Sequence, residues 1–219
     1  MPELRLRGGE VDGLDLHYLV EGRGPAVVLV HGLGGFAESW RHTLGTLAGR
    51  TTVYALVGGV VPGFGYRPSW IYRLVALPLI GEMLSLCGSA GLYKTALARC
   101  FHRAVREEVD FFVDFGFTER TSPGARAAYL ATLRHVRVDF EAHAPDYRRA
   151  IATLDLPVLL IHGRQDRVVP PTHCAQVAEG FARATVRWVD ECGHFPQIER
   201  AETVNRWLVD FLVGRTAPR

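Results

Sequence analysis

The 219-residue sequence predicts an α/β fold, in which a mostly parallel sheet carries a large helical insertion. Short apolar runs that alternate with helical patterns occur at both ends of the chain, as expected for parallel strands buried on both faces. From Pro68 to about Leu154 the pattern is helical, with no convincing strand. We therefore predict an α/β core formed by residues 1–61 and 156–219, with a helical lid over residues 62–155.

The first part of the core begins with a hairpin signal. Leu4–Gly8 and Leu14–Val20 alternate apolar and polar residues around a turn that contains glycine. Ala26–Val30 is a continuous apolar run, which predicts a strand buried on both faces. Ser39–Arg50 has apolar residues at helical spacing, and Thr51–Leu56 is the next predicted strand. This order is the strand–helix–strand start of an α/β sheet.

The second part of the core resumes the same alternation after the insertion. Pro157–Ile161 (PVLLI) predicts a buried strand, and Thr172–Ala182 predicts the helix that follows it. Thr185–Val189 is the last predicted strand, and a closing helix is expected from about Glu202 to Leu212. The carboxyl ends of these parallel strands are where we expect a site.

The helical insertion is expected to break at Gly88–Gly91 and at Thr121–Gly124. Its most apolar stretch, Trp70–Leu86, falls short of a membrane span of about 20 uninterrupted apolar residues. The residues that interrupt it are Arg73, Pro78 and Glu82. We therefore predict a buried or substrate-facing lid helix and no membrane partner.

Composition narrows the class of protein. The residues are 48% hydrophobic and 22% charged, with a formal net charge of +2, too small and dispersed for a nucleic-acid interface. The four cysteines have no C-x-x-C spacing, and the N-terminus has no apolar core of signal-peptide length, which favours reduced thiols in a cytoplasmic protein. The histidines are spread singly, so we expect no metal and no other cofactor.

A glycine-rich turn follows the first predicted buried strand. His31–Gly35 (HGLGG) would stand at the carboxyl end of that strand. Glycines there let the backbone N–H groups approach a ligand and stabilise a developing oxyanion. The competing interpretation is a plain strand-to-helix turn, which needs glycine for conformational reasons alone.

Two titratable residues follow the last two predicted strands. Asp166 lies on the loop after Pro157–Ile161, where a carboxylate is placed to orient an imidazole. It could instead be a helix N-terminal acid. His194 lies five residues after Thr185–Val189, in CGHFP, and a lone histidine is more often structural. Their positions after consecutive strands of one sheet favour a catalytic pair.

These motifs resemble the α/β-hydrolase fold superfamily, which includes lid-bearing esterases and hydrolases that cleave carbon–carbon bonds in ring-fission products. HG-L-GG, G-x-x-D-x-V-V-P and G-H-x-P-x-x-E are similar to its oxyanion, acid and base motifs, in the family's order. The resemblance implies a small-molecule substrate, an oxyanion loop at Gly32, Leu33 and Gly34, Asp166 as the orienting acid and His194 as the general base. Phe195 and the insertion would line an acyl or aromatic pocket.

The sequence departs from the family at the nucleophile. No G-x-S-x-G is present, and the interval between Leu56 and Pro68 is too short for a βαβ unit of about 30 residues. An internal deletion near residues 57–61 is the simplest account. Ser89, in CGSAG, has small neighbours but follows a helical segment rather than a strand. Cys192 is too close to His194 along one loop for in-line attack.

Two functions remain open. The first is a hydrolase of small apolar esters or ring-fission products that uses the His194–Asp166 pair and a backbone oxyanion hole. The second is a truncated, non-catalytic remnant or pseudoenzyme that binds a small molecule. Loss of a central strand would leave an unpaired edge, so we expect Thr51–Val61 to move into the gap or a homodimer to form.

Overall fold

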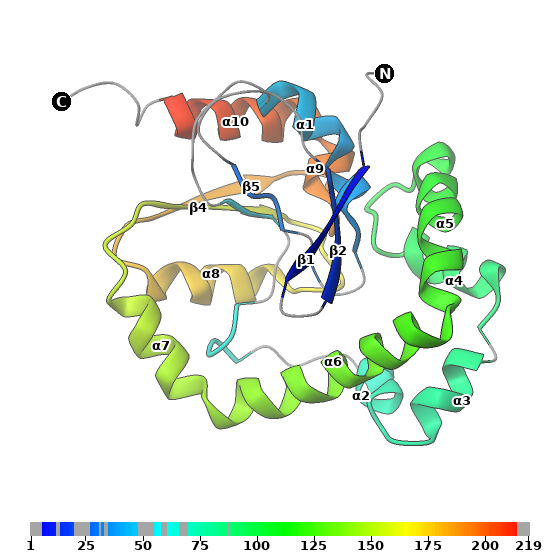
Figure 1. The fold of residues 1–219 in the computed structure, drawn as a ribbon. Coiled ribbons are helices and arrows are strands. Elements are labelled where there is room, and N and C mark those ends of the chain that lie inside the picture. The colour runs from blue at the N-terminus through cyan, green and yellow to red at the C-terminus, as the bar shows by residue number, and fades with distance from the viewer. Residues whose placement is uncertain are drawn as a thin grey trace.

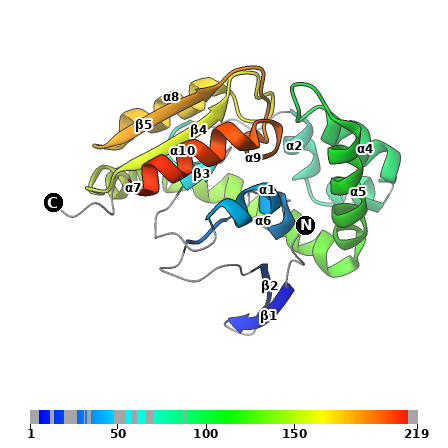
Figure 2. The same cartoon turned by 90° about the horizontal axis from the view of Figure 1, so that it is seen from above.

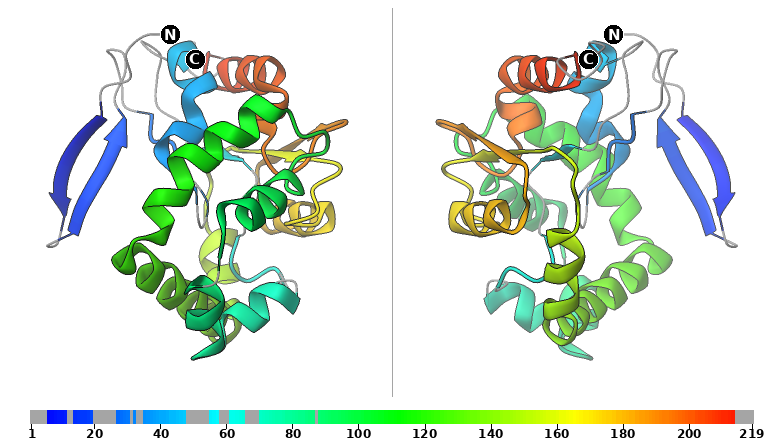
Figure 3. Two further views of the ribbon diagram at one scale, coloured as in Figure 1. Left: turned by 90° about the vertical axis from the view of Figure 1, so that its right-hand side faces the viewer. Right: turned by 90° about the vertical axis from the view of Figure 1, so that its left-hand side faces the viewer.

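The computed structural model describes residues 6–11, 14–19, 27–30, 32, 35–47, 55–57, 61–65, 70–86 and 88–213. The first elements are β1 (Leu6–Val11) and β2 (Leu14–Leu19), which pair antiparallel from Leu6 opposite Leu19 to Val11 opposite Leu14. This confirms the predicted hairpin. Figure 3 shows it on the outside of the molecule, apart from the main sheet.

The main sheet has three parallel strands in the order β3-β4-β5. They are β3 (Ala55–Val57), β4 (Val158–Gly163) and β5 (Ala184–Val189). β4 is central and buried on both faces, as its apolar run predicts, whereas β5 alternates between half-buried and exposed residues. Consecutive β4 and β5 thus present their carboxyl ends at one edge of the sheet.

Helices cover both faces of this sheet (Figure 1). On one side lie the 3₁₀ helix η1 (Ala37–Trp40) with α1 (Arg41–Leu47), and the C-terminal pair α9 (Pro196–Glu199) and α10 (Ala201–Val213). On the other side lies α8 (Pro171–Gly180). The core is formed where the sheet meets these helices, and its largest cluster of buried apolar side chains includes Leu159, Ile161, Val204 and Leu208.

The described elements between β3 and β4 are all helical. They are α2 (Trp70–Val75), α3 (Ile80–Leu86), α4 (Ala90–Ala98), α5 (Arg106–Thr121), α6 (Pro123–Ala142) and α7 (Ala144–Ala152). The breaks between α3 and α4 and between α5 and α6 fall at the predicted glycine-containing turns. Figure 2 shows α4 and α5 beside the end of the core at which α9 lies. No helix in the described part of the chain is both long and apolar enough to cross a membrane.

One predicted strand is absent from the structure. Val27–Val30, the described part of the Ala26–Val30 run, forms no strand. The side chains of Val27 and Leu29 pack against the main apolar cluster, whereas Val28 and Val30 are 57% and 69% exposed. The run was predicted to be covered on both faces, but only one face is covered. The strand that pairs with β4 is β3, which lies within the segment Thr51–Val61 that was expected to move into the gap.

Candidate active site

The two titratable residues of the sequence prediction meet at the carboxyl edge of the sheet. Asp166 lies on the loop after β4, and His194 lies on the loop after β5. Because β4 and β5 are parallel neighbours, these two loops leave the sheet side by side. The Asp166 Oδ2 atom lies 2.9 Å from the His194 Nδ1 atom. A carboxylate at this distance holds the imidazole in one orientation and leaves Nε2 to face outward.

Asp166 is held in place by its own loop. Its Oδ1 atom accepts hydrogen bonds from the backbone N–H groups of Val168 at 2.8 Å and Val169 at 3.0 Å. Its side chain is 1% exposed, so it is shielded from water. One carboxylate oxygen is thus used for positioning, while the other is directed at His194. The loop thus fixes the carboxylate that faces His194.

A second histidine, His162, shares this carboxylate. Its Nε2 atom lies 3.3 Å from Asp166 Oδ2 and 3.0 Å from the carbonyl oxygen of Val169. Both neighbours are acceptors, so this nitrogen carries the hydrogen. Burial of the ring lowers the pKa of His162, which favours the neutral form. The sequence analysis missed His162, whose only signal was its place near the end of a buried strand.

Hydrogen bonds connect the His194 loop to the segment between α4 and α5. The backbone N–H of His194 donates to the carbonyl oxygen of Cys100 at 2.7 Å. Glu199, at the end of α9, accepts from the backbone N–H groups of Gly193 and His102, each at 2.8 Å. One carboxylate therefore connects the His194 loop to the segment between α4 and α5. The base motif of the resemblance contains Glu199, but the sequence alone gave it no role.

Phe195 lies in an aromatic cluster between the core and the lid. Its ring centroid is 5.1 Å from those of Phe101 and Phe112, and 5.2 Å from that of His194. Phe36 joins the same cluster at 4.9 Å from Phe112. These contacts bring apolar surface beside the imidazole. The part of Phe195 in lining an acyl or aromatic pocket stays a prediction.

The predicted oxyanion loop is described only at its two ends. Leu33 and Gly34 lie outside the described residues. Gly32 is exposed, and its carbonyl oxygen accepts a hydrogen bond from the N–H of Gly35 at 2.9 Å, which closes a tight turn. The chain then runs directly to Phe36, which belongs to the aromatic cluster beside His194. The function of the loop as an oxyanion hole stays a prediction.

No serine in the described part of the chain hydrogen-bonds His194. Ser89 is the N-cap of α4, and its hydroxyl accepts from the N–H of Leu92 at 3.2 Å, as a helix-starting turn requires. Ser122 caps α6, and Ser39 and Ser85 donate to backbone carbonyls, while Ser69 lies outside the described residues.

Cys192 is no better placed as a nucleophile. It is fully buried, and burial raises the pKa of its thiol, with the Glu199 carboxylate adding to the effect. The reactive thiolate is thus disfavoured. Among the described residues, His, Cys, Asp and Glu side chains also form no group of three that could hold a metal ion.

Comparison with known proteins points to one family. The family model described as "alpha/beta hydrolase fold" matches residues 120–201, which include Asp166 and His194. A 2-hydroxy-6-oxononadienedioate/2-hydroxy-6-oxononatrienedioate hydrolase of Pseudomonas putida is 35% identical over 68 residues, covering 31% of this chain and 24% of the relative. The matched part thus spans about a quarter of the length of this relative.

Longer but more distant matches extend over almost the whole chain. A 2-hydroxy-6-oxo-6-(2'-aminophenyl)hexa-2,4-dienoic acid hydrolase of Metapseudomonas resinovorans is 24% identical over 264 positions, covering 93% of this chain and 89% of the relative. The structure of a meta-cleavage product hydrolase, CumD of Pseudomonas fluorescens, matches with a TM-score of 0.70 at 19% identity, covering 94% of this chain and 97% of that one. The sequence motifs, the family model over residues 120–201 and the solved structure agree on one architecture, the α/β-hydrolase fold.

Proposed function

We propose that this protein is a hydrolase in which His194, oriented by Asp166, acts as a general base on water. The observation that carries the proposal is the 2.9 Å contact between Asp166 Oδ2 and His194 Nδ1. The His194 side chain is 19% exposed, and its Nε2 atom has no partner among the described residues. That nitrogen is therefore available to a water molecule or a substrate.

In the proposed reaction, one proton moves from water to His194 and then from His194 to the leaving group. Neutral His194 takes a proton from water through Nε2 while the water oxygen bonds to the substrate carbonyl carbon. The Asp166 carboxylate stabilises the resulting imidazolium through Nδ1–H. Backbone N–H groups of the Gly32–Gly34 turn would hold the oxyanion. When the bond to the leaving group breaks, the imidazolium returns the proton to that group, and the acid product forms.

The proposed substrates are small apolar esters or ring-fission products. Both curated relatives are named as hydrolases of 2-hydroxy-6-oxo acids. The aromatic cluster of Phe36, Phe101, Phe112 and Phe195 beside His194 supports a substrate with an aromatic or acyl body.

We further propose that the strand and turn that carry the family's nucleophile are deleted between β3 and α2. Two findings support this. First, β3 pairs directly with β4 in parallel, so no strand lies between them in the described sheet. Second, the alignment with the Metapseudomonas relative spans 264 positions against 219 residues, which leaves at least 45 positions without a counterpart in this chain.

A non-catalytic protein that binds a small molecule is the second candidate function. The observation that favours it is the absence of any serine hydrogen-bonded to His194 in the described part of the chain. Without a nucleophile, catalysis rests on water activation alone, which is slower than attack by a hydroxyl fixed in place. Such a protein would still bind a small molecule but would not hydrolyse it.

One set of assays separates the two functions. Hydrolysis of short-chain p-nitrophenyl esters should fall at least about 100-fold in His194→Ala, because general-base catalysis contributes 10²–10⁴-fold. Ser89→Ala is the matched control and should keep the wild-type rate. A fluorophosphonate probe should label neither protein, since no activated serine is proposed. Equal rates for wild type and His194→Ala would contradict the hydrolase proposal and support the binding protein.

We also propose a cytoplasmic location. Cys174 and Cys192 are buried free thiols, and burial raises the pKa of Cys174 to about 11. Unpaired buried thiols are common in proteins of reducing compartments.

A further inference from the structure

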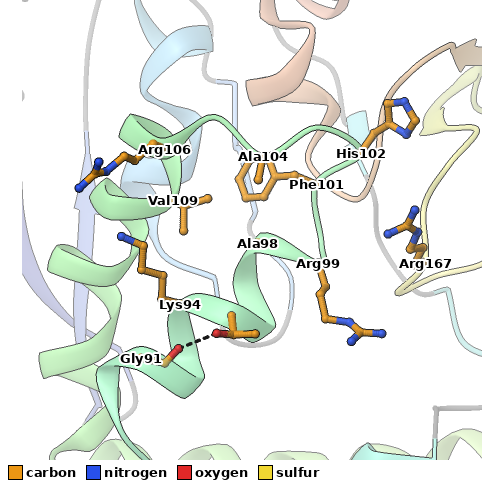
Figure 4. Close-up of a pocket in the computed structure, with 11 residues that line it drawn as sticks. Gly91, Lys94, Ala98, Arg99, Phe101, His102, Ala104, Arg106, Val109 and Arg167 are labelled. Atoms are coloured by element: carbon orange, nitrogen blue, oxygen red, sulfur yellow. Dashed lines mark hydrogen bonds between the residues drawn. The ribbon is translucent and has the colours of Figure 1, made fainter.

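A basic pocket opens between the lid and the Asp166 loop. It has a volume of about 570 Å³ and is lined by α4, the segment from Arg99 to Ala104, the start of α5, and Arg167. Its lining includes five basic residues and no acidic one: Lys94, Arg99, His102, Arg106 and Arg167. Figure 4 shows Arg99, His102 and Arg167 on one side of the pocket, with Lys94 and Arg106 on the other.

The positive charge of this pocket is only partly neutralised. Lys94 and Arg106 share one carboxylate, that of Asp110. Arg99 and Arg167 have no acidic partner in the described part of the chain, and both side chains are exposed. Four permanent cations against one carboxylate leave three uncompensated positive charges around the pocket. Like charges around one pocket repel each other, so an anion bound between them would relieve the repulsion.

Apolar side chains form the rest of the lining. Ala98, Phe101, Ala104 and Val109 line the pocket between the two groups of cations. The Phe101 ring also packs against Phe195 of the aromatic cluster. Inorganic anions gain nothing from such surface, whereas an organic anion with an apolar body can bury it there. The volume also lies within the range of small-molecule sites.

The pocket is physically joined to the loops that hold the His–Asp pair. Arg167 directly follows Asp166 in the chain. The segment that carries Arg99 and His102 is bonded to the His194 loop through Cys100 and to Gly193 through Glu199. A ligand that bridges Arg99 and Arg167 would therefore contact both the lid and the core. It would hold the two together beside the pair without touching His194.

We propose that this pocket binds a small organic carboxylate with an apolar body, with Arg99 and Arg167 as its charged contacts. The inference does not require that the chain hydrolyses any substrate. Arginine suits this role because its planar guanidinium can bind both carboxylate oxygens at once. Screening by salt should weaken the contact, because both guanidinium groups are exposed to solvent.

Benzoate is a suitable probe, with benzyl alcohol as its neutral counterpart of similar shape and phosphate as an anion without an apolar body. Calorimetric titration at low salt should show benzoate binding more tightly than either control. Arg99→Gln/Arg167→Gln should weaken benzoate binding about tenfold, since hydrogen bonds between charged groups are among the strongest in proteins. The same double variant should bind benzyl alcohol with wild-type affinity.

The control variant is Arg206→Gln, which removes the same charge from the exposed face of α10, away from the pocket. It should keep wild-type affinity for benzoate, and circular dichroism should show that all variants are folded. Equal binding of benzoate and benzyl alcohol, equal binding of benzoate and phosphate, or an equal loss in Arg206→Gln would each overturn the proposal. So would the absence of benzoate binding to wild type. His194→Ala should still bind benzoate, so failure of the hydrolase proposal would leave this result unchanged.

Discussion

His162 lies 3.3 Å from Asp166 through its Nε2 atom, at the carboxylate oxygen that also faces His194. The carboxylate therefore lies between two imidazole rings that differ in their exposure to solvent. His162 is buried within the sheet, whereas His194 is partly open to solvent. The buried ring is fixed by its contacts with Val169 and Asp166, whereas the outer ring has one nitrogen at Asp166 and a side chain that is 19% exposed. Of the two histidines, only His194 is thus open to a ligand.

Replacing His162 with Leu should destabilise the fold by about 1–3 kcal/mol, because it leaves the Val169 carbonyl oxygen and Asp166 Oδ2 without this donor. Urea unfolding at pH 7.5 measures the change. A variant as stable as wild type would show that the ring contributes packing only.

Stability should fall as the pH drops below about 6.5, the ordinary pKa of histidine. Burial lowers the pKa values of His42, His162 and His173 in the folded protein. Between the unfolded and the folded pKa, the unfolded chain binds protons that the folded chain does not, so acid favours unfolding. Above about pH 7 all three rings are neutral in both states and contribute no slope. Melting temperatures from pH 8 to pH 5 test this, and a rise in stability on acidification would contradict it.

The parts of the site that sequence could predict depend on local patterns. Asp166 follows a strand with a continuous apolar run, His194 follows a strand whose burial alternates, and parallel pairing brings their loops together. For the sheet, the sequence left two outcomes open, a shift of Thr51–Val61 or a homodimer, and the pairing of β3 with β4 agrees with the first. The apolar pattern of β3 alone does not say which strand it pairs with. Residues 27–30 have an apolar run but form no strand, because a strand also needs a paired neighbour, which the apolar run alone does not reveal. His162 and the basic pocket depend on contacts between residues far apart in the chain.

Gly193 should not tolerate a side chain. A Cβ atom at this position would lie 2.4 Å from the carbonyl oxygen of Cys100 and 2.7 Å from the backbone nitrogen of His102. Both are backbone atoms of the segment that holds the His194 loop, so Gly193→Ala must displace one of the two chains. We expect a loss of at least about 2 kcal/mol in stability, by analogy with overpacking of a filled core, and loss of ester hydrolysis.

Gly124→Ala is the matched control for this substitution. Gly124 lies in the first turn of α6, and nothing would stand within 4 Å of its new Cβ atom. Because alanine restricts the unfolded chain and favours the helix, this variant should gain about 0.4–1 kcal/mol. Thermal unfolding of both variants measures the contrast. Similar effects at the two positions would show that the Gly193 contact relaxes without cost.

Arg41 and Glu108 form a clamp between α1 of the core and α5 of the lid. The Arg41 side chain is 7% exposed, its guanidinium lies 3.8 Å from the centre of the Phe111 ring, and burial lowers its pKa to about 10. Glu108 also lies 3.1 Å from His42 Nε2. Arg41→Met should therefore cost about 2–3 kcal/mol, less than a fully buried pair, because His42 and solvent still reach the carboxylate.

A double-mutant cycle separates the pair from the packing around it. Glu108→Gln alone leaves the Arg41 charge buried without its partner, so it too should destabilise the protein. Arg41→Met/Glu108→Gln should cost at least about 1 kcal/mol less than the two single losses together, since no buried charge is left uncompensated. Urea unfolding of the four proteins gives the coupling. Additive losses would show that the two side chains act independently.

The exposed apolar face of Val27–Val30 should make the protein self-associate. Val28 and Val30 are 57% and 69% exposed, and no strand in the described part of the chain pairs with this segment. Exposed apolar side chains that lie together on a surface favour association between molecules. Size-exclusion chromatography with light scattering should show a dimer or larger species.

Val28→Lys/Val30→Lys should shift this species toward monomer, because lysines that face each other across the contact repel. Val138→Lys, at a 59% exposed position on α6, is the control and should leave the oligomer intact. A wild-type protein that stays monomeric across concentrations and melts cooperatively would show that this face needs no partner.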